Sequence, residues 1–223
     1  MDIQINNITC CNCLDGIKTI PDKSIKSVIC DPPYFLGMTH DGKKANMADL
    51  AICTPFYQEL FKQFKRVMTK DASLYFFCDW RGYTYYYEQL VQASLIPDNC
   101  IVWDKGSGCG NFYTYEHEFI IFATNNRSFH VRGARGIIHD VPSFRTGARV
   151  SDGEKVHPTQ KPVALIEKLI KDSTETGDTV LDCFAGSGTT AVAAERTGRK
   201  YYCFELQPKY VDIGQQRIIK EKA

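Results

Sequence analysis

The sequence predicts an α/β fold, built on an open, mostly parallel twisted sheet with helices on both faces. Two observations carry this prediction. Short apolar runs that stop at an acidic residue predict buried strands, and three of them end at Asp31, Asp79 and Asp182. Other segments, such as residues 56–67, carry apolar side chains at helical spacing, and strands that alternate with helices are typical of a parallel sheet.

Length and composition favour one domain. With 223 residues and 43% hydrophobic content the chain can bury one sizeable core, so we expect a single domain over residues 1–223 with local insertions. The formal net charge is only +1. A general field for binding polyanions is therefore excluded, and any nucleic-acid surface must be a local patch.

The cysteines and the absence of long apolar runs bear on location and partners. Ten cysteines would suggest disulfides in a small secreted protein, yet residues 1–4 open no signal peptide and the spacings form no disulfide framework. We expect reduced thiols and a cytoplasmic protein. Cys10, Cys11 and Cys13 have no second ligand pair downstream, so no metal is expected. No apolar run approaches the roughly 20 residues that span a bilayer, so no membrane partner is expected.

The first predicted buried strand, residues 27–30, ends in a rigid corner. Pro32 and Pro33 lack backbone N–H groups, so the strand ladder cannot continue through them and Asp31 lies where a sheet ends. The Asp31 carboxylate and the Pro32 carbonyl would be fixed acceptors, with the ring of Tyr34 beside them. Such a corner suits a flat group that carries an amine.

The middle of the chain predicts two strands, at residues 101–103 and 118–123, joined by a glycine-containing connector with several aromatic rings. A basic segment follows at about residues 126–150, with five arginines against one acid, Asp140. A solvated loop and a loop that contacts phosphates or a DNA groove fit this composition about equally well. The arginines are Arg127, Arg132, Arg135, Arg145 and Arg149.

The last third of the chain predicts a nucleotide-binding half-site. Pro162 suits the first turn of a helix whose amino end could hold an anion. A strand at residues 179–182, a glycine turn, a helix and a second strand that ends at Glu205 then follow. Gly186 and Gly188 permit a tight turn and a close backbone approach, and Glu205 lies about where a ribose-binding acid falls in such units.

The glycine turn leaves two classes of enzyme open. Residues 186–191 nominally satisfy the dinucleotide fingerprint, so a nicotinamide oxidoreductase is a competitor. Two observations count against an oxidoreductase. Only 35 residues follow Gly188 (223 minus 188), too few for the rest of a dinucleotide-binding domain. In addition, the motif that begins at Asp31 would have no function. A mononucleoside cofactor explains both stretches, because strand-end residues of an open α/β sheet gather at one crevice.

Three motifs resemble those of the S-adenosylmethionine-dependent DNA amino-methyltransferases. Asp31-Pro32-Pro33-Tyr34 resembles motif IV, residues 182–190 resemble motif I and residues 157–162 resemble motif X. The catalytic motif comes first and the cofactor glycines last, as in the permuted beta class of this family. The resemblance runs from about Thr9 to about Arg217. It implies a Rossmann-like methyltransferase fold with circularly permuted motif order, and a DNA-recognition region at about residues 126–150.

The resemblance implies S-adenosylmethionine as the cofactor. Phe184, Gly186 and Gly188 would shape the turn around its methionine end, Glu205 would take the ribose hydroxyls, and Thr159 and Lys161 would help fix the methionine carboxylate. Asn12 and Cys13 stand where relatives grip adenine, with Asn12 in place of the usual acid, and Cys183 stands where relatives commonly have proline. The implied cofactor set is Asn12, Cys13, Thr159, Lys161, Asp182, Phe184, Gly186, Gly188, Thr189 and Glu205.

The resemblance also implies a reaction. Asp31 and the Pro32 carbonyl would accept the two hydrogens of an amino group and aim its lone pair at the sulfonium methyl for direct in-line transfer. The base must first be flipped out of the duplex. The catalytic set is Asp31, Pro32, Pro33 and Tyr34. Tyr34, Phe112, Tyr113, Tyr115 and the five arginines would contact DNA.

The resemblance also leads to expectations about the target base and the partners. In this family the Asp-Pro-Pro-Tyr form mostly accompanies adenine, so adenine in double-stranded DNA is expected and cytosine is the alternative. RNA as substrate, and a nucleic-acid-binding module that has lost activity, also stay open. A homodimer is expected, because beta-class relatives are often dimers.

Overall fold

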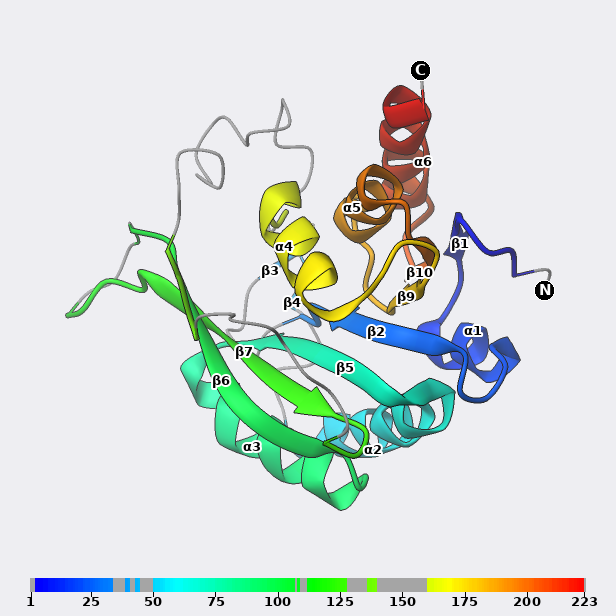
Figure 1. Cartoon of the computed structure of the whole chain (residues 1–223). Helices are drawn as coiled ribbons and strands as arrows, with labels where there is room; N and C mark the ends of the chain where they lie inside the picture. Colours follow the sequence, from blue (N-terminus) through cyan, green and yellow to red (C-terminus); the bar gives the residue numbers. More distant parts are fainter. Residues whose placement is uncertain are drawn as a thin grey trace.

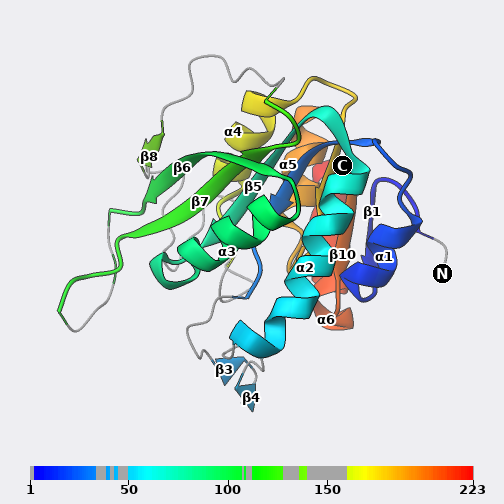
Figure 2. The same cartoon turned by 90° about the horizontal axis from the view of Figure 1, so that it is seen from below.

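A computed structural model describes residues 3–33, 39–40, 43–44, 50–106, 108, 112–127, 136–139 and 160–222. In these residues an eight-stranded sheet, in the order β1-β10-β9-β2-β5-β7-β6-β8, lies between two layers of helices (Figure 1, and Figure 2 from below). The predicted α/β fold class is confirmed. A separate two-stranded ribbon pairs β3 (Thr39–His40) with β4 (Lys43–Lys44).

Five neighbouring strands of the sheet run parallel, so their carboxyl ends meet at one edge. They are β1 (Asn7–Cys10), β10 (Lys200–Glu205), β9 (Thr179–Asp182), β2 (Ile25–Cys30) and β5 (Met68–Cys78). Next to β5, β7 (His117–Thr124) runs antiparallel to it and to β6 (Ile96–Asp104), and β8 (Ile137–His139) runs parallel to β6. Strands β9 and β10, from the last quarter of the sequence, thus lie between β1 and β2.

Within the described residues, helices cover both faces of the sheet (Figures 1 and 2). One face carries α1 (Cys13–Thr19), α2 (Leu50–Val67) and α3 (Trp80–Gln92), and the other carries α4 (Val163–Ser173), α5 (Thr189–Thr197) and α6 (Pro208–Lys222). The apolar residues of the helical pattern at 56–67, such as Phe61 and Phe64, are buried against the first face. Pro162 stands one residue before α4 instead of inside its first turn.

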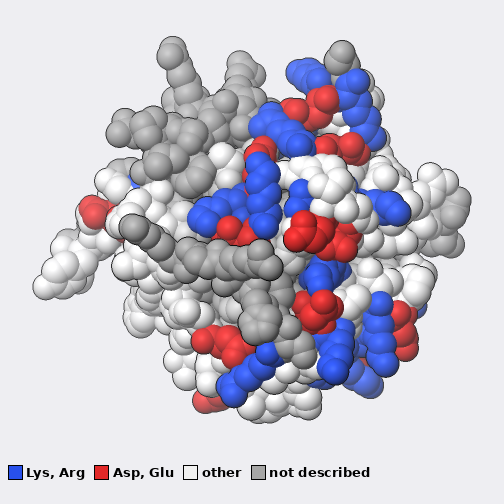
Figure 3. Space-filling model, in the orientation of Figure 1, with Lys and Arg blue, Asp and Glu red and all other residues white. Residues whose placement is uncertain are grey.

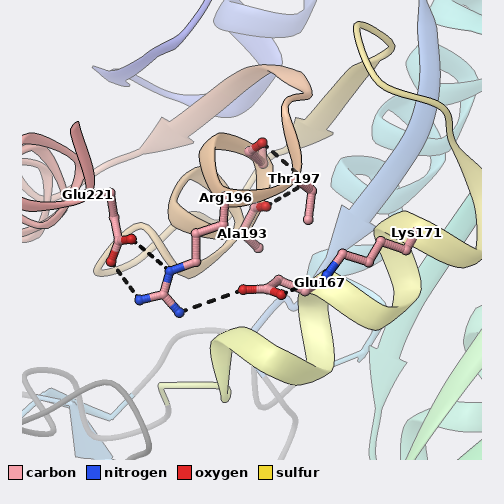
Figure 4. Close-up of polar contacts among 7 residues, drawn as sticks. Glu167, Lys171, Ala193, Arg196, Thr197 and Glu221 are labelled. Carbon is pink, nitrogen blue, oxygen red and sulfur yellow. Dashed lines mark hydrogen bonds and ion pairs between the residues drawn. The ribbon is translucent and has the colours of Figure 1, made fainter.

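Ion pairs join the three helices of the second face. Arg196 of α5 contacts Glu221 of α6 at 2.6 Å and Glu167 of α4 at 3.6 Å, and Lys171 contacts Glu167 from within α4 at 3.0 Å (Figure 4). On the side of the molecule shown in Figure 3, basic and acidic side chains are interspersed over the described residues. Partly exposed pairs of this kind contribute about 0–1 kcal/mol each, so they orient the helices more than they stabilise them.

Candidate active site

The parallel strands bring three acidic side chains to one edge of the sheet. Asp31 directly follows β2, Asp182 is the last residue of β9 and Glu205 is the last residue of β10. The three carboxylates interact electrostatically, since both Asp31 and Glu205 act to raise the pKa of Asp182. The structure therefore brings together the strand-end acids that the sequence analysis assigned to one crevice.

Asp182 lies next to the glycine turn and accepts hydrogen bonds from both of its ends. Its Oδ1 accepts the N–H of Phe184 at 2.8 Å, and its Oδ2 accepts the hydroxyl of Thr190 at 2.5 Å. Burial raises the pKa of Asp182 to about 7, although these two hydrogen bonds act to lower it. Asp182 thus shapes the turn from below, and a direct contact between Asp182 and the cofactor stays a prediction.

The glycine turn needs its glycines for two separate reasons. Gly186 and Gly188 have φ angles of +51° and +81°, in the left-handed region that side chains disfavour. In addition, a Cβ at Gly188 would lie 2.7 Å from Cδ1 of Ile8 and 3.0 Å from Cα of Gly214. Gly188 therefore also lets α6 approach the turn, a role that the sequence analysis did not identify.

Glu205 is held in a defined orientation beside this turn. Its Oε2 accepts the N–H of Gly186 at 2.9 Å, and its Oε1 accepts the N–H of Gln207 at 2.8 Å. On the other side, the Cys11 N–H donates to the Glu205 carbonyl at 3.0 Å. The carboxylate, the turn and the start of α1 thus form one continuous wall at the carboxyl edge of the sheet.

The remaining residues of the predicted cofactor set lie around this wall. Asn12 caps α1, with its Oδ1 accepting the Leu14 N–H at 2.9 Å, and the buried Cys13 begins the helix. Phe184 is half-buried and packs edge-on against Phe56. Thr189 begins α5, where its hydroxyl accepts a hydrogen bond from Arg217 at 3.3 Å. Their contacts with a cofactor stay predictions.

Lys161 forms an ion pair with Asp31 in this structure. Its Nζ is 2.7 Å from Oδ2 of Asp31 and 3.2 Å from Oε2 of Glu118, and it also lies 5.3 Å from the centre of the Phe77 ring. Burial acts to lower the pKa of Lys161, but the charges of Asp31 and Glu118 outweigh it and raise the pKa to about 12. Lys161 is therefore a cation at physiological pH, and its predicted contact with a methionine carboxylate stays a prediction.

Glu118 and Lys105 were not identified from the sequence. Glu118 lies in β7 opposite Trp103 of β6, and Lys105 directly follows β6, with its Nζ 3.4 Å from Oε1 of Glu118. An acid at the start of an apolar strand was the available signal for Glu118. Its significance depends on the pairing of β7 with β5, which brings Glu118 to the edge that carries Asp31.

The predicted DNA-contacting residues are described only in part. Phe112 and Tyr113 are 98% and 91% exposed on the connector between β6 and β7, and Tyr115 is exposed nearby. Arg127 follows β7 and pairs with Asp98 at 3.0 Å. Outside the described residues lie Tyr34, Arg132, Arg135, Arg145, Arg149 and Thr159.

Two absences hold for the described part of the chain. Within it, no helix combines the length and apolarity needed to cross a membrane. In the same residues, no group of three or more His, Cys, Asp or Glu side chains is arranged to hold a metal ion.

Together these features define a class of enzyme. A glycine turn with an oriented strand-end carboxylate fits a nucleoside cofactor, and a second strand end places Asp31 and Pro32 at the same edge. Such an edge is typical of a Rossmann-like enzyme that binds a nucleoside cofactor. A family model described as DNA methylase matches residues 25–216. The chain belongs to this family, the DNA amino-methyltransferases that use S-adenosylmethionine, and the competing nicotinamide oxidoreductase is set aside.

Individual relatives agree with this assignment. The chain is 29% identical over 253 residues to the Type II methyltransferase M1.MboII of Moraxella bovis, covering 94% of this chain and 95% of that protein. It is 27% identical over 249 residues to the Type II methyltransferase M.HinfI of Haemophilus influenzae, covering 96% and 68%.

Solved structures agree on the fold. The complex of M1.HpyAVI with S-adenosylmethionine (SAM) superposes with a TM-score of 0.73 at 21% identity, covering 95% of this chain and 98% of that one. The cytosine-N4-specific PvuII DNA methyltransferase superposes with a TM-score of 0.76 at 18% identity, covering 94% and 85%. The predicted Rossmann-like methyltransferase fold is confirmed.

Proposed function

We propose that this protein methylates the exocyclic amino group of adenine in double-stranded DNA. The observation that carries the proposal is the position of Asp31. It follows β2 directly, precedes Pro32, contacts Lys161 and shares its sheet edge with the glycine turn. The choice of adenine rests on the Asp-Pro-Pro-Tyr form of the motif at residues 31–34.

An aromatic amino group is a poor nucleophile because its lone pair is delocalised into the ring. Asp31 and the carbonyl of Pro32 would accept hydrogen bonds from its two N–H groups, and this arrangement draws the nitrogen towards tetrahedral geometry. Acceptors that are fixed in advance stabilise the positive charge that develops on nitrogen. The Lys161 ammonium lies 2.7 Å from the Asp31 carboxylate that this role requires.

The residues of the glycine-turn wall would hold the cofactor. The backbone at Gly186 and Gly188 allows close approach, and Glu205 offers a carboxylate whose orientation is fixed by two backbone N–H groups. Bound S-adenosylmethionine would supply an electrophilic methyl group. Because this wall and Asp31 lie at one sheet edge, donor and acceptor could be held together, and such proximity lowers the barrier substantially.

The target amine lies inside the base stack, so the adenine has to be flipped out at a cost of about a few kcal/mol. Tyr34 is the proposed stacking partner in the pocket. The exposed rings of Phe112 and Tyr113 are suited to stacking on bases, and Arg127 with the other arginines of residues 126–150 is suited to phosphates. We further propose that the working form is a homodimer, and sedimentation as a monomer at assay concentrations would contradict this.

The second candidate is methylation of the cytosine amino group. Acceptors around an amine do not distinguish the two bases, and the PvuII enzyme, which has the same fold, is cytosine-N4-specific.

One experiment tests both candidates and the choice of nucleic acid. Labelled methyl groups are offered with duplex DNA, single-stranded DNA and RNA in parallel, and the products are digested to nucleosides and identified by mass. N6-methyladenine from duplex DNA is expected. N4-methylcytosine would replace the first candidate by the second, and label in RNA alone would contradict both.

A further inference from the structure

Four side chains of alternating charge form a row of three ion pairs that ends at Asp31. Lys105 contacts Glu118 at 3.4 Å, Glu118 contacts Lys161 at 3.2 Å, and Lys161 contacts Asp31 at 2.7 Å. They come from four places in the fold: the end of β6, β7, the residues before α4 and the end of β2. No motif of the sequence includes Glu118.

The central pair of this row is well removed from water. The side chain of Lys161 is 9% exposed and that of Glu118 is 16% exposed. A buried ammonium is unfavourable unless carboxylates compensate it. Two carboxylates compensate Lys161, so its position depends on both.

Glu118 is the better anchored of these two carboxylates. It lies inside β7, which is paired with a strand on each side. Phe119 of β7 pairs with Cys78 of β5, and Glu118 itself pairs with Trp103 of β6. Asp31, in contrast, follows the last residue of β2 and precedes two prolines. Glu118 therefore ties Lys161 to β7, at the edge of the sheet that carries Asp31.

We propose that Glu118 is a positioning residue for methyl transfer, acting on Asp31 through Lys161. This inference rests on the proposed function of Asp31 as the acceptor of the target amine. A lysine that paired with Asp31 alone would follow the carboxylate and compete with the incoming amino group for it. With Glu118 on its other side, Lys161 shares its charge between two carboxylates and is held in one place beside Asp31.

A purely structural role would be to fasten β7 to the residues before α4. That role predicts loss of stability and general loss of activity, whereas positioning predicts a slower chemical step with intact cofactor binding. The two are separated by measuring single-turnover methyl transfer, the dissociation constant for S-adenosylmethionine and the Tm of each variant.

The test compares Glu118→Gln with Glu116→Gln. Glu116 precedes β7 by one residue, is exposed and accepts a hydrogen bond from Thr114, so its replacement removes the same charge close by. We expect Glu118→Gln to slow methyl transfer about 10- to 100-fold, because a misplacement of about 1 Å at a reacting group can cost about 100-fold. Affinity for S-adenosylmethionine should stay within about threefold, and Glu116→Gln should stay within about twofold of the natural protein in all measurements.

A double-mutant cycle tests whether Glu118 acts through Lys161. Lys161→Met should be at least as slow as Glu118→Gln, and adding Glu118→Gln to it should slow transfer no more than about twofold further. Multiplicative losses in the cycle would overturn the inference, as would transfer by Glu118→Gln within threefold of the natural rate. If Glu118→Gln unfolds, Glu118→Asp takes its place, because it keeps the charge but withdraws it by one methylene and should give an intermediate rate.

The failure of this inference differs visibly from failure of the proposed function. If the natural protein transfers no methyl group to DNA, the proposed function is wrong. If it does so and Glu118→Gln is equally fast, only the role of Glu118 is wrong.

Discussion

Replacing Gly188 by alanine tests how the glycine turn is held. The φ angle of +81° disfavours any side chain, and this alone costs about 1–2 kcal/mol. The new Cβ would also lie 2.7 Å from Cδ1 of Ile8 and 3.0 Å from Cα of Gly214. Overpacking of this kind costs about 1–3 kcal/mol.

Together these effects should lower the free energy of unfolding by about 2–5 kcal/mol. For a chain of this size that corresponds to a fall in Tm of roughly 4–20 °C. Gly177→Ala is the matched control, since Gly177 has a φ of +90° but no atom within 4 Å of the added Cβ. It should lose only the backbone part, about 1–2 kcal/mol.

Urea unfolding followed by circular dichroism measures both variants. Adding Ile8→Val, which removes the nearest clashing atom, should restore part of the stability of Gly188→Ala, although Ile8→Val alone should destabilise by about 0.5–1.5 kcal/mol. Equal losses for Gly188→Ala and Gly177→Ala would refute the packing explanation. The packing explanation would also be refuted if the losses in unfolding free energy from Ile8→Val and Gly188→Ala simply added in the double variant.

Three further predictions concern the site. Asp31→Asn should slow methyl transfer by about 100-fold or more while S-adenosylmethionine affinity, measured by calorimetry, stays nearly unchanged; retained transfer would contradict the acceptor role. Asp182 has a folded pKa of about 7, above the ordinary carboxyl value, so its contribution to stability is present below about pH 4 and is lost as the pH rises through 7. The free energy of unfolding of Asp182→Asn, relative to the natural protein, should therefore rise by up to a few kcal/mol between pH 4 and 7 in parallel urea titrations, and a flat difference would exclude this. Tyr113→Ser should leave the Tm unchanged, because the ring is 91% exposed, yet weaken duplex DNA binding by about 5-fold or more in a filter or anisotropy assay.

The sequence predicted the parallel half of the site because its signals are local. An acid that ends an apolar run marks the carboxyl end of a strand, and Asp31, Asp182 and Glu205 all carry that signal. A glycine turn between a strand and a helix is equally local. Both kinds of residue could be assigned without knowing how the strands are ordered.

The remaining features depend on contacts between distant segments. Glu118 meets Lys161 only because β7 joins the sheet antiparallel to β5, and that direction leaves no mark in the sequence. The approach of Gly214 to Gly188 depends in the same way on where α6 packs. Lys161 lies beside Asp31 at the carboxyl edge of the sheet, and this partner could not be chosen from sequence because both residues lie in segments without periodic pattern.

The strand order β1-β10-β9-β2 has a consequence for how the protein is made. Residues 7–10 pair with residues 202–205, and β9 must enter between β10 and β2. The ribosome synthesises the chain from its amino end, so β1 and β2 emerge before β9 and β10. Until then, the edges that pair with β9 and β10 stay unpaired. Pairings of such high sequence separation fold slowly. A nascent chain that already carries Asp31 therefore lacks the glycine turn, and the sheet edge that the two share can form only after residues 179–205 have left the ribosome.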